Sequence, residues 1–220
     1  MTLIELVNDL RREASVSGSA VTTAVNQTGE NRRLVEWVKR AYTEIQNIFF
    51  DWRFLRVHGT FTTTAGNNTI TAPADLNIYD VSRFFDDEGR ELEIFQEEEV
   101  DWYLNPNLSG RPEYIIIKSD NNLRLYPTPD AAYSYTYDYF RVPFELVADS
   151  DEPAFDKQFH TIITARAMTY YANYESAPEI MKQGTELWQI FYPRLMAKEA
   201  PDKVQYYGRS DHKEIRVVAE

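Results

Sequence analysis

The sequence Tyr-Ser-Tyr-Thr-Tyr-Asp-Tyr-Phe at residues 133–140 has a tyrosine at every second position. Successive side chains of a β-strand point to opposite faces of a sheet, so this alternation predicts a strand with its four tyrosines on one face. We expect that face to be half-buried against neighbouring strands. Aromatic side chains on a sheet can also stack on single-stranded nucleic acid, but Asp138 and the acidic surroundings disfavour that interpretation.

Other strand patterns precede this one. The clearest is a hairpin, in which residues 114–118 and 123–126 flank the turn sequence Asp-Asn-Asn at 120–122. A strand at 54–63 is followed by a turn at 66–68 that leads back through 69–71. The remaining predictions are a strand at 81–85 and a short acidic helix at 96–103 that Pro106 stops.

Helical periodicity dominates both ends of the chain. Thr2 and Glu5 have the spacing of a capping box, and they precede apolar residues at helical intervals. After a long loop at 15–30, a second helix is expected from the N-cap Asn31 to about Phe50. Beyond Pro153 we expect a buried helix ending near residue 174 and another at 178–198, which Pro193 should bend or break.

This order predicts an α+β fold. The N- and C-terminal helix pairs, within residues 1–55 and 154–200, are expected to pack together as a helical bundle. Residues 56–153 are expected to form an inserted β-rich acidic domain. Residues 201–220 have no periodic apolar face and are predicted to be an extended C-terminal tail.

Composition excludes several classes of protein. The 220 residues include no cysteine, which rules out disulfides and thiolate metal sites, and the net charge of −12 argues against a protein that grips phosphate backbones. The acidity is local, since residues 61–160 hold 7 basic and 20 acidic groups. That segment is interpreted as a solvated acidic surface, or as one that repels nucleic acid or docks a basic partner. Neither a membrane span nor a signal peptide is recognisable.

No arrangement of residues predicts catalysis, a cofactor site or a metal site. The three histidines, His58, His160 and His212, are isolated from one another in sequence, and His160 is interpreted as a hydrogen-bonded helix residue. The acidic groups at 86–89 and 149–152 lack calcium-loop spacing and are interpreted as turns. Successive carboxylates on the predicted acidic helix point in different directions and do not converge on one ion, which favours a solvated face over a cation site.

A succession of short segments carries a resemblance to a known family. These segments are FFDWRFL at 49–55, TFTTT at 60–64, TITAPADL at 69–76, PEY at 112–114, LRLYPTPD at 123–130 and DSDEPAF at 149–155. Their order over about residues 1–200 resembles the head-to-tail adaptor (connector) proteins of tailed bacteriophages.

The resemblance implies a non-enzymatic structural protein of the virion neck, made in the host cytoplasm. It implies a twelve-fold ring that docks under the portal protein and receives a tail or nozzle protein below. DNA would pass through the channel without specific binding during genome ejection. Mixed charges on the second helix, among them Arg33, Glu36 and Arg40, suit contacts between neighbouring copies.

Two groups of residues are candidates for these roles. The portal-binding tail is expected to use Lys203, Tyr206, Tyr207, Arg209, Ile215, Arg216 and Val217, the alternative being a frayed terminus. The carboxylates expected to face the channel and repel DNA are Glu97, Glu98, Glu99 and Asp101.

Two rival functions remain open. One is a protein- or carbohydrate-binding module in which the tyrosine face and Trp102 form the site. The other is a hydrolase that uses paired carboxylates of the acidic segment.

Overall fold

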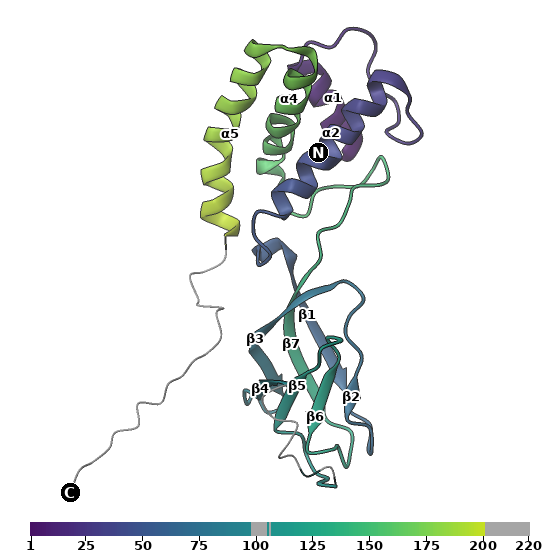
Figure 1. The fold of residues 1–220 in the computed structure, drawn as a ribbon, viewed down its shortest axis with the longest axis vertical. Coiled ribbons are helices and arrows are strands. Elements are labelled where there is room, and N and C mark those ends of the chain that lie inside the picture. The colour runs from purple at the N-terminus through teal and green to yellow at the C-terminus, as the bar shows by residue number, and fades with distance from the viewer. Residues whose placement is uncertain (98–104, 106, 201–220) are drawn as a thin grey trace, which may run out of the picture.

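The computed structural model describes residues 1–97, 105 and 107–200, and these form an α+β fold with four α-helices and two β-sheets. Figure 1 shows the helices at one end of the molecule and the sheets at the other. The helices are α1 (Leu3–Glu13), α2 (Gly29–Gln46), α4 (Thr161–Glu175) and α5 (Pro178–Glu199).

The predicted capping box at the start of α1 is confirmed. The Thr2 hydroxyl accepts a hydrogen bond from the Glu5 backbone N–H at 3.4 Å, and the Glu5 carboxylate accepts one from the Thr2 N–H at 2.8 Å. Two backbone donors that the helix itself leaves free are thereby satisfied. The apolar side of α1, at Leu3, Leu6, Val7 and Leu10, is fully buried.

The boundaries of α2 differ from the prediction at both ends. The N-cap is Thr28 and not Asn31, whose side-chain oxygen instead accepts from Arg11 at 3.0 Å. The helix ends at Gln46, four residues before the predicted end near Phe50. Its carbonyl at Ile45 accepts a hydrogen bond from the Trp52 indole at 3.1 Å, so the chain turns back on the helix end at this point.

The loop between α1 and α2 packs against the helices. The Asn8 side chain accepts from the Val21 N–H at 2.8 Å and donates to the Val21 carbonyl at 2.9 Å. Val21 and Ala24 are buried. A segment predicted as a loop from its small polar residues therefore contributes two residues to the core.

Helix α4 packs against α5, α2 and α1. It follows a short 3-10 helix, η2 (Lys157–Phe159), and buries residues on several sides. Helix α5 continues through Pro193, so of the predicted bend or break the break is wrong, and the bend stays a prediction. Proline has no N–H, so the carbonyl of Gln189, four residues earlier, lacks its helical donor. Pro193 and Gln189 are both exposed, and water can therefore hydrogen-bond to that carbonyl.

The first sheet has three antiparallel strands in the order β1 (Arg56–Thr62), β7 (Ser134–Arg141) and β3 (Leu76–Asp86). The tyrosine strand is thus its central strand. A 3-10 turn, η1 (Arg53–Leu55), joins β1 to the helices. Between Tyr79 and Phe84 the register of β3 shifts against β7, which makes a bulge of residues 80–83.

The second sheet has the order β2 (Thr69–Ile70), β6 (Leu123–Tyr126), β5 (Tyr114–Ile117) and β4 (Glu93–Gln96). The β5–β6 hairpin is confirmed, with Tyr114 opposite Tyr126 and Ile117 opposite Leu123. The implied return of 69–71 onto β1 is wrong, because β2 pairs with β6 in the other sheet. Gln96 lies in β4, parallel to β5, and not in the predicted acidic helix.

The core has two clusters of buried apolar residues. One lies among the helices and extends through Trp52 and Leu55 to Phe140, at the end of β7. The other lies between the two sheets and contains Tyr135, Tyr137 and Tyr139 with aliphatic residues of β5 and β6. Strand β7 therefore links the two clusters, because Phe140 belongs to the first and Tyr135, Tyr137 and Tyr139 belong to the second.

Candidate functional site

The tyrosine face of β7 is closed by packing. Tyr135, Tyr137 and Tyr139 are at most 7% exposed, and Tyr137 stacks on Phe84 with ring centroids 5.5 Å apart. The Tyr135 hydroxyl donates to the Pro112 carbonyl at 3.0 Å. The predicted packing against neighbours is confirmed. The alternative prediction, a module that binds a carbohydrate or protein on this face, is wrong because the second sheet covers the three tyrosines.

Burial raises the pKa of Tyr135 and of Tyr139 to about 12, and it also raises the pKa of Tyr137. The neutral phenol is the form that the fold favours, since an ordinary tyrosine titrates near pH 10. These residues therefore contribute stability below about pH 10 that is lost as the pH rises toward 12.

We expect a spectrophotometric titration to show two classes among the 15 tyrosines. The late class should ionise near pH 12, together with loss of the near-ultraviolet circular dichroism of the folded protein. Tyr135→Phe and Tyr139→Phe should each remove one tyrosine from the late class. A single class near pH 10, with the fold intact, would contradict the buried face.

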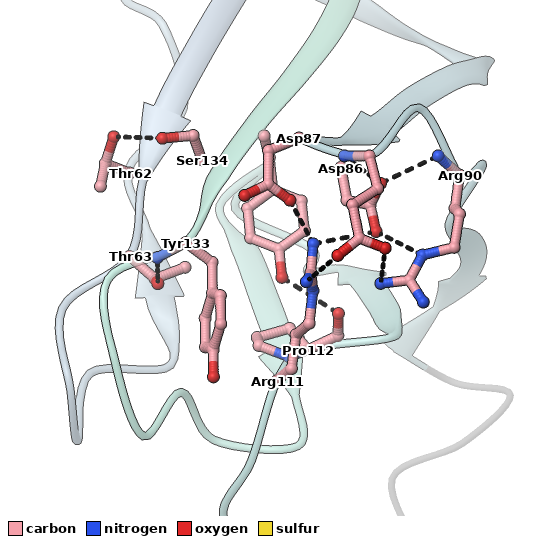
Figure 2. A network of polar contacts seen from close by, with 11 residues as sticks. Thr62, Thr63, Asp86, Asp87, Arg90, Arg111, Pro112, Tyr133 and Ser134 are labelled. Atoms are coloured by element: carbon pink, nitrogen blue, oxygen red, sulfur yellow. Dashed lines mark hydrogen bonds and ion pairs between the residues drawn. The ribbon is translucent and has the colours of Figure 1, made fainter.

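A network of charged side chains holds the β3–β4 turn (Figure 2). The Arg111 guanidinium donates to Glu88 at 3.0 Å, to Asp86 at 3.2 Å and to Asp87, while Arg90 donates to Asp86 at 2.8 Å. The Asp86 carboxylate also accepts from the backbone N–H groups of Glu88 and Arg90. These bonds join the turn to the segment before β5.

Asp86 is the buried centre of this network. Burial would by itself raise the pKa of Asp86, but the hydrogen bonds from Arg90 and Glu88 outweigh it and lower that pKa. The carboxylate is therefore ionised and fully occupied with local donors. Because Asp86 pairs with Tyr135 and Arg56 pairs with Phe140, the network lies at the end of the sheet that is farther from the helices. This arrangement makes a fixed acidic turn.

The outer face of the first sheet carries two buried carboxylates with cationic partners. Asp80, which is 1% exposed, accepts from Arg56 at 2.8 Å. Asp138 lies 2.8 Å from His58 Nδ1 and accepts from Arg83 at 3.3 Å. Each of these two carboxylates has an arginine partner within the chain.

The helices carry arginines stacked on tyrosines. Arg33 lies over the ring of Tyr174 at 4.4 Å, and Arg40 lies over the ring of Tyr170 at 4.6 Å. Glu44 forms an ion pair with Arg166 of α4, and this partner lowers the pKa of Glu44. Glu44, one of the mixed charges of α2, is thus engaged within its own chain.

His160 is a hydrogen-bonded residue at the start of α4, as predicted. Its Nε2 lies 2.9 Å from the Phe155 carbonyl, and its Nδ1 lies 2.6 Å from the Met1 amino group. Burial lowers the pKa of His160. The partners fit a neutral ring that donates from Nε2 and accepts at Nδ1.

Of the predicted site residues, the described chain includes only Glu97. Its carboxylate accepts from the Ser119 backbone N–H at 3.2 Å, in the turn that follows β5. Glu98, Glu99, Asp101 and Trp102 lie outside the described residues. The same is true of the tail residues Lys203, Tyr206, Tyr207, Arg209, Ile215, Arg216 and Val217.

Within residues 1–97, 105 and 107–200, no group of three or more acidic or histidine side chains is arranged to hold a metal ion. No helix in the same residues combines the length and the apolar character that crossing a membrane requires.

One comparison with known proteins identifies a family. The model of the family described as SU10 adaptor protein matches residues 1–209, which is nearly the whole chain. A search of curated proteins finds no match.

Proposed function

The chain belongs to the SU10 adaptor protein family, and we propose that it is the head-to-tail connector of a tailed bacteriophage. In this proposal a twelve-fold ring of copies docks under the portal protein and receives a tail or nozzle protein below. DNA passes through its channel without specific binding. The protein works by shape, as a non-enzymatic component of the virion neck that is made in the host cytoplasm.

The match over residues 1–209 is the observation that carries this proposal. The separation of helices from sheets supports it, because a ring subunit needs a rigid body with distinct faces. We propose that the helices of residues 1–55 and 154–200 act as one bundle that forms the ring. Residues 56–153 would then be a separate β-rich domain projecting from it.

The acidic segment supports a channel role. Glu97, the residue that follows β4, is proposed to line the channel together with Glu98, Glu99 and Asp101. Like charges deny the DNA phosphates a binding minimum, so the genome slides instead of adhering. The segment 201–220 is proposed to be an arm that extends to the portal, with its tyrosines and Ile215 and Val217 as anchors.

Native mass measurement of the purified protein, alone and mixed with the portal of the same phage, tests this function. We expect a closed ring that joins the portal. A full-length variant with Tyr206, Tyr207, Ile215 and Val217 all replaced by aspartate should form the same ring but fail to join the portal. A protein that stays monomeric even with the portal would contradict the ring, and normal docking of the variant would contradict the arm.

A further inference from the structure

Helix α2 presents a stripe of alternating charge to solvent. Arg33, Glu36 and Arg40 are all exposed and follow the spacing i, i+3, i+7, which places them on one side of the helix. The two arginines lie over tyrosine rings of α4, and Glu36 accepts from Arg32 at 2.7 Å. A guanidinium stacked on a ring keeps its N–H edge available, so a carboxylate can bind with little loss of side-chain freedom.

Helix α5 presents the opposite alternation at the same spacing. Glu179, Lys182 and Glu186 are exposed on the side away from the buried Gly184 and Leu195. These three residues form no ion pair within the described part of the chain. Over seven helical residues, about 10 Å, the charge order is negative, positive, negative on α5 and positive, negative, positive on α2.

The two helices that carry these stripes lie on different flanks of α4. Helix α4 packs against both α2 and α5, and Figure 1 shows them on opposite sides of it. Both α2 and α5 run toward the sheets, while α4 runs away from them. Copies in a closed ring keep one direction along its axis, so α2 of one copy can lie parallel to α5 of the next.

We propose that the contact between ring neighbours pairs α2 of one copy with α5 of a second copy of this chain. The pairs are Arg33 with Glu179, Glu36 with Lys182, and Arg40 with Glu186. Charge alternation of this kind fixes register and rejects shifted pairings more than it adds affinity. The inference rests on the proposed ring and names the two surfaces that close it.

Two full-length charge-reversal variants test the pairing. Arg33→Glu/Arg40→Glu makes the α2 stripe wholly negative, and Glu179→Arg/Glu186→Arg makes the α5 stripe wholly positive. Each variant alone places like charges at two of the three pairs between neighbouring copies and leaves the Glu36–Lys182 pair unchanged. We expect the concentration for half assembly, read by native mass, to rise at least about tenfold in each case.

An equimolar mixture of the two variants provides the decisive measurement. The reversed α2 then faces the reversed α5, and the unaltered α5 of the first variant faces the unaltered α2 of the second. Rings of alternating copies are therefore expected to form again. Arg12→Glu/Lys118→Glu, which changes the net charge as much as the α2 variant does, should assemble like the wild type.

The absence of cysteine allows a second test by cross-linking. Glu36→Cys/Lys182→Cys should give a ladder of oxidised multimers, whereas Glu36→Cys/Ser119→Cys should not. Two results would overturn the pairing if the wild type forms rings. One is normal assembly of both reversal variants, and the other is a mixture of the two variants that does not form rings. Either result would leave the proposed ring itself uncontradicted. A wild type that never forms rings would overturn the ring itself.

Discussion

Replacing Trp52 with alanine is expected to lower the free energy of unfolding by about 4 kcal/mol, the middle of the range for a buried aromatic residue. The Trp52 side chain is fully buried where the helices meet β1. It stacks on Phe54 with centroids 5.4 Å apart, meets Phe49 edge-on at 5.2 Å and donates to the Ile45 carbonyl. Its removal leaves a cavity and takes away the side-chain hydrogen bond to the Ile45 carbonyl, which then keeps only its backbone donors.

Chemical denaturation of Trp52→Ala beside Trp37→Ala provides the measurement. Trp37 is only half-buried, with Tyr171 and Tyr174 as its ring neighbours, so we expect its loss to cost about 2 kcal/mol. Equal costs for the two variants would contradict the view that Trp52 is the joint between the helical core and the first sheet.

The local signals in the sequence predicted local structure well. The Thr2–Glu5 spacing located the start of α1, and the alternation of tyrosines identified β7 together with its buried face. The β5–β6 hairpin followed from its turn sequence. In each case the signal and the structure lie within a few residues, so no long-range contact was needed to choose the conformation.

The wrong predictions concern places where contacts with distant segments determine the strand pairing or the end of a helix. Thr69 and Ile70 follow a turn and have strand propensity, but pairing with β6, more than fifty residues later, places them in the other sheet. The end of α2 depends on the Trp52 indole, and the exposure of Pro193 allows α5 to continue. No motif signalled the charge network of Arg111, because its acidic partners lie more than twenty residues before it.

Substitution of Gly59 by alanine is expected to destabilise the protein by about 2 kcal/mol. Gly59 lies opposite Tyr137 in the β1–β7 ladder, and the tyrosine ring covers it. A Cβ atom at Gly59 would lie 2.5 Å from the Cζ atom of Tyr137. The ring has little room to retreat, because it stacks on Phe84 and Tyr139. Elsewhere in a strand, alanine is the better residue, since glycine loses more backbone entropy on folding.

Gly110→Ala is the matched control, because an added Cβ there would have no atom within 4 Å. It should leave the midpoint of thermal unfolding unchanged or slightly raised. In a double-mutant cycle, Gly59→Ala should cost much less in a Tyr137→Ala background, since the clashing ring is gone. Equal costs in both backgrounds would mean that the strain at Gly59 comes from the backbone. The packing of the Tyr137 ring on β1 would then not be what fixes the register of β7.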